Sequence, residues 1–333
     1  MAARYDFAIF GTRPLAALLC GLLAHRHGQQ VLRIADPVPR QRLPRAIDIA
    51  LPLAVRPGSW RLVGTAAAET ARLLADIDGQ DRLDRVHVKL VADLPETVTA
   101  LAHLTHVAAG YGVVARDGVF HGVPRFSREV DLTHSSVQTV EAARVTLTPG
   151  PAGAELRLDG EALRVGQIVL ADDDAVLDLL PEAELPAQLV VQPAMATLTA
   201  PAKRLPVQVM RYLDRGVILM QRADHSVLAL VAGHADAEAR LGSCLAGMLP
   251  LQRRATTHYR RLATTDGAPL IGRLTPSNLI LITGAGSVAA FLAPPLARLL
   301  AGVPSDEEQA WFAAHDPART DRAPVADIVE AYL

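Results

Sequence analysis

The N-terminal stretch constrains the fold more than any other part of the chain, because it reads as strand, glycine turn, helix, strand. The apolar run 7–10 is too short for a helix and ends at Gly11, as expected of a strand buried in a parallel sheet. A helix rich in leucine and alanine follows to about Ala24, and Gly28 closes it before a second strand over 31–34. The sequence therefore predicts a βαβ unit.

The turn in this unit departs from the G-x-G-x-x-G fingerprint that holds a dinucleotide diphosphate. Its three positions are Gly11, Arg13 and Ala16 here, so only the first glycine is present. The guanidinium of Arg13 can pair with a phosphate, but its bulk can also fill the space that a diphosphate needs. A plain βαβ unit with a glycine turn is the alternative.

On the nucleotide interpretation, the turn residues contact the ligand, namely Gly11, Thr12, Arg13 and Pro14. The acidic residue that holds the ribose hydroxyls falls at Ala35 or Asp36, depending on the length of the preceding loop. We choose Asp36.

Composition excludes several classes of protein. The chain has 333 residues, half of them hydrophobic, and 33 basic residues nearly balance 35 acidic ones. This balance gives no reason to expect nucleic acid or an anionic membrane as a partner.

The two cysteines show no metal-ligand spacing, so we expect no metal and a reduced compartment. No signal peptide is visible, and the apolar stretch 279–302 is interrupted by glycines and prolines. We expect a cytoplasmic protein without a membrane span.

The middle of the chain predicts alternating helices and strands. After Asp36, prolines and arginines indicate an irregular connection to about Pro57. Helices are predicted over 65–77, 94–109 and 235–248. Asp117-Gly118 predicts a hairpin turn within 112–123. Strands over 145–148, 154–158 and 163–170 form a β-meander whose last strand can rejoin the parallel sheet.

Residues 185–231 contain further strands whose alternation suits an antiparallel sheet, with Val207, Val209 and Tyr212 set against Gln208 and Arg211. We expect residues 185–261 to form a second domain. It is inserted into a discontinuous first domain made of 1–184 and 262–333.

The C-terminal part has the same order of strand, glycine loop and helix as the start of the N-terminal unit. Residues 279–282 predict a buried strand, 283–287 a glycine loop, and 288–300 a helix. Such a loop presents backbone N–H groups to a ligand with partial negative charge. Beyond it, Trp311 and Phe312 predict a short helix that either packs back or docks on a partner.

This C-terminal segment resembles that of FAD-dependent oxidoreductases of the D-amino-acid oxidase and glycine oxidase type. Their pattern R-x-x-T-x-D-G-x-P-x-I-G is followed by an asparagine-leucine strand, a T-G-x-G loop and a helix that contains A-P. The matching positions are Arg261, Thr264, Asp266, Gly267, Pro269, Ile271, Gly272, Asn278, Leu279, Thr283, Gly284, Gly286, Ala293 and Pro294.

The resemblance implies an α/β fold with a Rossmann-like FAD-binding domain, a parallel sheet and β-meander, and an inserted antiparallel-sheet substrate domain. It implies FAD as cofactor, with the loop Gly284, Ala285, Gly286 and Ser287 along the flavin ring. Arg261 matches the arginine that pairs with the substrate carboxylate in members that oxidise amino acids. Further pocket candidates are Tyr259 and Tyr212, and candidates for proton transfer are His225, His234 and His258.

The chain also departs from the family pattern. Besides Arg13 and Ala16, it has the carboxylates Asp172, Asp173 and Asp174 where members often have alanine-glycine, near a site expected to hold a diphosphate. Ala285 replaces a common histidine. The leading hypothesis is hydride transfer from the C–N bond of a small amine or amino acid to FAD. Two alternatives stay open. One is a non-catalytic subunit or accessory protein of a partner enzyme, and the other is an oxidoreductase that binds nicotinamide or another nucleotide. A homo-oligomer also stays open.

Overall fold

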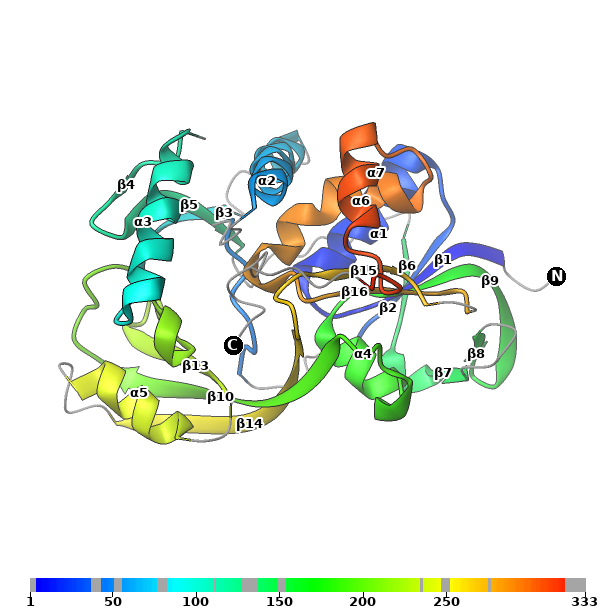
Figure 1. The fold of residues 1–333 in the computed structure, drawn as a ribbon. Helices are drawn as coiled ribbons and strands as arrows, with labels where there is room; N and C mark the ends of the chain where they lie inside the picture. Colours follow the sequence, from blue (N-terminus) through cyan, green and yellow to red (C-terminus); the bar gives the residue numbers. More distant parts are fainter. Residues whose placement is uncertain are drawn as a thin grey trace.

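The computed structural model describes residues 4–36, 43–50, 56–76, 83–110, 112–126, 137–148, 154–233, 236–246, 252–274 and 277–320. Two β-sheets lie beside each other, and helices cover both faces of the first one (Figure 1). The chain thus has the mixed α/β architecture that the sequence predicts, with one sheet rich in parallel strands and one mostly antiparallel. No helix of the described residues is long and apolar enough to cross a membrane.

The first sheet contains the expected βαβ unit. Its order is β15-β16-β9-β1-β2-β6, and all neighbours on this path pair in parallel except β15 with β16. Helix α1 (Pro14–His27) connects β1 to β2 and ends at Gly28, whose φ of 63° is left-handed. The strand bounds are β1 Arg4–Phe10, β2 Val31–Ile34, β6 Gln138–Val140, β9 Glu161–Leu170, β15 Leu270–Arg273 and β16 Leu279–Thr283.

Strand β9 joins the meander to this sheet, as the sequence predicts. Its first residues pair antiparallel with β8 (Glu155–Leu158), which pairs in turn with β7 (Val145–Thr148). From Arg164 onward β9 lies parallel to β1. The meander and helix α4 (Asp173–Leu179) lie on the face of the sheet opposite α1, α6 (Ala293–Leu300) and α7 (Asp306–Ala313) (Figure 1).

The second sheet has the order β14-β10-β13-β12-β11-β3-β5-β4, and its pairs are antiparallel except β11 with β3. Three of its strands come from residues 83–126, outside the region expected to form the second domain, so the domain boundaries stay a prediction. The turn Asp117-Gly118 connects β4 and β5, as expected. The bounds are β3 Leu83–Val91, β4 Ala115–Arg116, β5 Val119–Phe126, β10 Leu189–Pro201, β11 Val209–Tyr212, β12 Val217–Gln221, β13 Ser226–Ala232 and β14 Arg253–Thr264.

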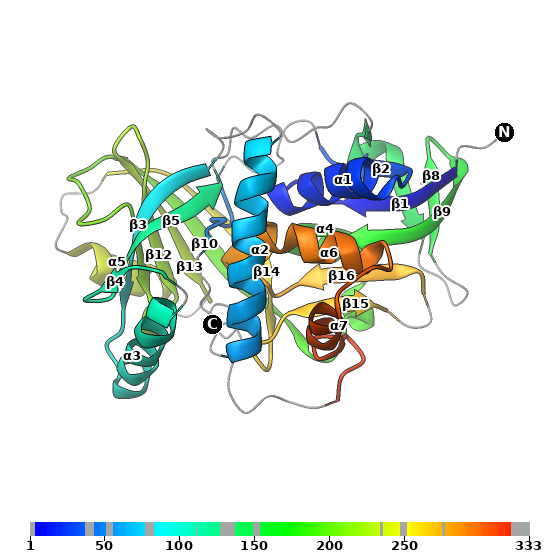
Figure 2. The same cartoon turned by 90° about the horizontal axis from the view of Figure 1, so that it is seen from above.

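Helix α2 (Pro57–Asp76) lies between the two sheets (Figure 2). It begins eight residues before the predicted start at 65, because proline is tolerated in the first turn of a helix. Trp60 is buried in the core of the second sheet, while Val63 and Ala66 are buried in the core of the first. This one helix therefore ties the two cores together. The described residues also form helices α3 (Pro95–Gly110) and α5 (Ala237–Leu245), and short 3-10 turns at Ala142–Arg144, Glu182–Glu184 and Leu213–Arg215.

The segment after the glycine loop corrects the predicted single helix over 288–300. It is a 3-10 helix, η6 (Gly286–Leu292), followed by α6 (Ala293–Leu300). Pro294 and Pro295 have no backbone N–H, so they cannot donate to carbonyls four residues earlier, and the α-helix begins at them. The segment is nonetheless buried: Phe291 is fully enclosed and packs against Phe126 with ring centroids 4.7 Å apart.

Helix α7 (Asp306–Ala313) packs back on the first core through Trp311 and Phe312, which answers the question that the sequence left open for this helix. Arg298 of α6 holds it in place by pairing with both Glu69 of α2 and Glu308 of α7, at 2.8 Å and 2.6 Å.

Glu308 gives this contact a pH dependence. Burial alone would raise the pKa of Glu308, but hydrogen bonds from Arg298 and Ser305 lower it. A carboxylate whose pKa is lowered by folding contributes stability at pH values above its unfolded pKa of about 4.3, and the contribution disappears as pH falls through the folded pKa.

Glu308→Gln keeps the capping acceptor for Ser305 but removes the charge. We expect it to cost about 1.5–3 kcal/mol of unfolding free energy at pH 7. Urea denaturation should show this difference vanishing in acid, and a difference that persists there would contradict the assignment.

Candidate functional site

The candidate site lies where three neighbouring parallel strands end. Strands β1, β9 and β16 are adjacent in the first sheet, so their carboxyl ends meet at one edge. Gly11 follows β1, Asp172 follows β9 and Gly284 follows β16. Ligands of open α/β sheets bind in the crevice outside such strand ends. The structure therefore brings the two predicted glycine turns to the same edge, although Gly11 and Gly284 lie 273 positions apart in the sequence.

Gly11 makes the tight turn that the first glycine of the fingerprint provides, at a place where a side chain would not fit. Its φ is +156°, and a Cβ at this position would lie 2.8 Å from the Cβ of Ala16 and 3.0 Å from Oδ2 of Asp172. Arg13 is the N-cap of α1, and Pro14 is its first residue. Asp36 follows β2 at the same edge and is half-buried.

Asp172 occupies the centre of this edge and uses both carboxylate oxygens. Its Oδ2 accepts the backbone N–H of Thr12 at 2.9 Å, and its Oδ1 accepts the N–H of Ala175 at 2.8 Å, which caps helix α4. The residue is only 4% exposed. Burial raises the pKa of Asp172, although the two hydrogen bonds and the charge of Arg13 oppose the rise.

The two following carboxylates bind other parts of the site. Asp173 accepts the hydroxyl of Thr283, at the end of β16, at 2.6 Å, so the carboxylate run contacts both neighbouring strand ends. Asp174 pairs with Arg45 at 2.5 Å.

Arg13 also has an internal partner. Its Nη2 lies 2.6 Å from Oδ1 of Asp48, and its side chain is 24% exposed. Burial would lower the pKa of Arg13, but the carboxylates of Asp48, Asp173 and Asp172 together raise it. Its bulk therefore faces acidic side chains of this chain.

The glycine loop after β16 is held against the rest of the protein. Gly284 has a φ of +73°, and a Cβ there would lie 3.0 Å from Cγ2 of Thr264. Ala285 and Ser287 are buried, and the carbonyl of Ser287 accepts the N–H of Ile49 at 2.9 Å. Gly286, with a φ of +57°, completes the turn.

The second sheet contributes Tyr259 and Arg261 of β14, which share one face of the strand because they are two residues apart. The hydroxyl of Tyr259 donates to the carbonyl of Arg45 at 3.1 Å, and the guanidinium of Arg45 lies 4.9 Å from its ring centroid. Burial raises the pKa of Tyr259 to about 12, against the opposing charges of Arg261 and Arg45. Tyr259 is therefore protonated at neutral pH.

Arg211 is a residue of this region that the sequence assigned to the wrong face. We expected it opposite Val209 on β11, but it lies on the same side, as strand alternation requires of residues two apart. Its side chain is 5% exposed, and Nη1 lies 3.5 Å from Oγ of Ser287 in the glycine loop. Burial and the charge of Arg261 lower its pKa to about 9, which still leaves the guanidinium charged at pH 7. The only sequence feature that could have identified Arg211 as a site residue was its charge within an otherwise apolar strand.

Other candidates lie elsewhere. Tyr212 neighbours Arg211 on β11 but packs with the cluster on the other face of the sheet, and His225 lies in the turn before β13. His234 lies outside the described residues.

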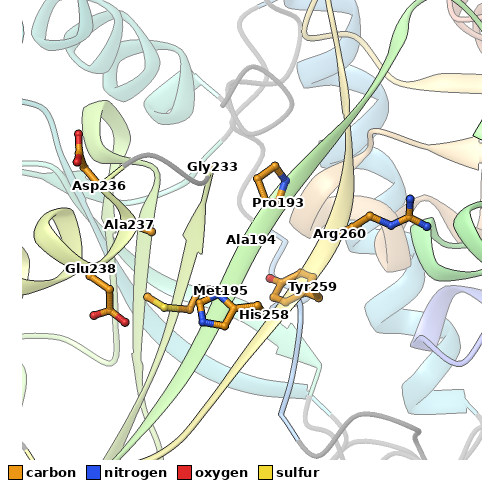
Figure 3. Close-up of a pocket in the computed structure, with 10 residues that line it drawn as sticks. All are labelled: Pro193, Ala194, Met195, Gly233, Asp236, Ala237, Glu238, His258, Tyr259 and Arg260. Carbon is orange, nitrogen blue, oxygen red and sulfur yellow. The ribbon is translucent and has the colours of Figure 1, made fainter.

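His258 lies opposite Met195 in the ladder between β10 and β14. It lines a cavity of about 460 Å³ together with Asp236 and Glu238, from the start of α5 (Figure 3). Tyr259 also lines this cavity, whereas Arg261 and the glycine loop do not.

Comparison with known proteins shows the fold. No protein-family model matches the chain, and no curated protein sequence does. Among solved structures, L-proline dehydrogenase from P. horikoshii has 13% identity and a TM-score of 0.70, over 98% of this chain and 100% of that one.

Two further similar structures are oxidases. Iminodiacetate oxidase from Chelativorans sp. BNC1 has 19% identity and a TM-score of 0.64, over 89% of this chain and 94% of that one. Glycine oxidase from Geobacillus kaustophilus has 17% identity and a TM-score of 0.64, over 96% and 99%. The chain therefore has the fold of these amino-acid oxidases and dehydrogenases, as the resemblance of its C-terminal segment implies.

Proposed function

We propose that this protein is an FAD-dependent oxidoreductase that oxidises the C–N bond of an amine or amino acid. The observation that carries the proposal is the meeting of the two glycine turns with buried arginine from the second sheet, within a fold shared with amino-acid oxidases. When bound, FAD would supply the hydride acceptor, and the protein would supply binding and orientation.

The residues fit this cofactor at most of its expected contacts. Gly11 makes the tight turn that the first glycine of the fingerprint provides, and Gly284 to Ser287 offer a buried turn for the flavin ring. Thr12, Arg13 and Pro14 complete the diphosphate turn, and Asp36 is placed after β2 for a ribose. Two of these contacts are already engaged within the chain, because Asp172 accepts the Thr12 N–H and Asp48 pairs with Arg13.

The arginines favour a substrate that bears a carboxylate. Arg261 would pair with that group, a task that suits the planar guanidinium fork. Arg211 adds a second buried positive charge beside it, near the loop that would face the flavin. Iminodiacetate, glycine and L-proline, the compounds in the names of the similar structures, are amines of this kind. Tyr259, protonated at neutral pH, would shape the pocket and would not act as a base.

A second candidate function is a non-catalytic subunit of a partner enzyme. It is favoured by one observation, that carboxylates of this chain engage both Thr12 and Arg13 where a diphosphate would bind. In either case we propose a cytoplasmic location, since Cys20 and Cys244 are both free and buried.

The absorption spectrum of the purified protein separates the two. If the protein is an FAD-dependent oxidoreductase, its spectrum should show flavin bands, either as purified or after incubation with FAD, and heating should release intact FAD. A protein that shows no flavin bands and gains none with excess FAD would refute it.

A further inference from the structure

Asp172 stands where the cofactor's diphosphate is expected to bind. Its Oδ2 accepts the Thr12 N–H, the first amide after the glycine of the turn. The same oxygen lies 3.0 Å from the place where a Cβ of Gly11 would be. The carboxylate thus occupies the turn immediately before Arg13, the position whose glycine in the fingerprint lets the backbone approach the diphosphate.

We propose that Asp172 is an internal competitor of the diphosphate, so that dinucleotide binding requires its carboxylate to be protonated or displaced. This inference rests on the proposed function and names the residue that controls cofactor affinity at the same site.

The charges around Asp172 support competition. Asp48, Asp172, Asp173 and Asp174 supply four carboxylates, and Arg13 and Arg45 supply two guanidinium groups. Four negative and two positive charges leave a net charge of −2 when all are ionised. A diphosphate brought to this edge meets like charge at short range, in a buried setting where repulsion is weakly screened.

The protonation state of Asp172 then sets affinity. Protonation removes the charge nearest the turn and makes Asp172 a weaker acceptor for the Thr12 N–H, so that a phosphate oxygen can replace it. Burial raises the pKa of Asp172, which moves this change toward neutral pH. Affinity for a diphosphate ligand should therefore rise as pH falls. The charged groups that face Asp172 are Arg13, the N-cap of α1, and Asp174 of α4, and Asp173 lies next to it.

Asp172→Ser isolates the effect with little damage to the fold. Serine is a good N-cap, so its hydroxyl can still accept the Ala175 N–H and preserve the start of α4. It removes the charge and leaves the Thr12 N–H without its internal acceptor. Asp178→Asn is the matched control, because Asp178 is an exposed carboxylate on the same helix.

The experiment is titration of the full chain with FAD, ADP and riboflavin at intervals from pH 5 to pH 8, followed by calorimetry. We expect Asp172→Ser to bind FAD and ADP about tenfold or more tightly than the wild type at pH 8, a change of at least one decade in affinity. Riboflavin, which lacks a diphosphate, should bind both forms equally. Wild-type affinity for FAD, whose diphosphate keeps its charge over this range, should rise as pH falls, that of Asp172→Ser should change little, and Asp178→Asn should behave as wild type.

The outcomes separate this inference from the proposed function. Tight FAD binding by the wild type, with Asp172→Ser no tighter and no pH dependence, would refute the role of Asp172 and leave the oxidoreductase proposal standing. Absence of FAD binding in both forms, with melting curves that show both folded, would refute both. A gain for riboflavin equal to that for ADP would also overturn the inference, because the effect would then not act on the diphosphate.

Discussion

Arg261→Ala is expected to lower kcat/KM for carboxylate-bearing amines by about 10²–10³-fold, because it removes a charged, bidentate contact from a partly buried site. Most of the loss should appear in KM, since the carboxylate is held equally in the ground and transition states. Arg261→Lys should recover part of the loss, because an ammonium keeps the charge but not the planar fork. The measurement is steady-state oxidation of glycine, L-proline and iminodiacetate with an artificial electron acceptor.

Arg260→Ala is the matched control for Arg261→Ala. It removes a guanidinium from the residue that precedes Arg261 in β14. The side chain of Arg260 lies on the opposite face, is 58% exposed and lies 3.5 Å from Glu182. Its kcat/KM should stay within about threefold of the wild type. Equal losses in the two variants would contradict a specific role for Arg261. A specific role would also be contradicted if Arg261→Ala lowered kcat/KM equally for amines with and without a carboxylate.

Arg319→Ala is expected to lower the free energy of unfolding by about 3–5 kcal/mol, the usual cost of breaking a buried ion pair from one side. Nη2 of Arg319 lies 2.9 Å from both carboxylate oxygens of Asp266, and the two side chains are 8% and 3% exposed. Arg319 also donates to the carbonyls of Ala268 and Pro269, so it fixes the turn that follows Arg261 and β14.

Urea denaturation measures this loss, and Arg116→Ala provides the comparison. Arg116 is 87% exposed and lies 3.6 Å from Asp117, so its removal should cost less than about 1 kcal/mol. The double variant Asp266→Ala/Arg319→Ala should be less destabilised than the sum of its single variants, because the second change removes the charge that the first leaves unpaired. Additive losses would show that the pair acts through separate contacts.

Local patterns predicted the parts of the fold that local chemistry determines. The apolar run before Gly11 and the closing Gly28 gave the βαβ unit, and Asp117-Gly118, with positive φ at both residues, gave a two-residue hairpin. The strand and glycine turn around Gly284 were likewise readable from sequence. The break between η6 and α6 was missed, although Pro294 and Pro295 carried the signal.

What sequence could not supply depends on contacts between distant residues. Arg211 is buried only because η6 and the glycine loop pack on the second sheet, and nothing adjacent to it in the sequence indicates Ser287. The run Asp172 to Asp174 was predicted to lie near the diphosphate. That Asp172 bonds the Thr12 amide, 160 residues away, follows only from the pairing of β1 with β9. The ion pair of Arg319 with Asp266 spans 53 residues and was likewise invisible.

Reduction of protein-bound FAD by an amine is the measurement that tests the central claim most directly. The protein is loaded with FAD, using Asp172→Ser where the wild type binds weakly, and mixed without oxygen with glycine, L-proline or iminodiacetate. Bleaching of the flavin bands by at least one of these amines, and its loss in Arg261→Ala but not in Arg260→Ala, is the predicted result. A flavin-loaded protein whose bands no carboxylate-bearing amine bleaches would contradict the oxidation of a C–N bond and favour the non-catalytic subunit.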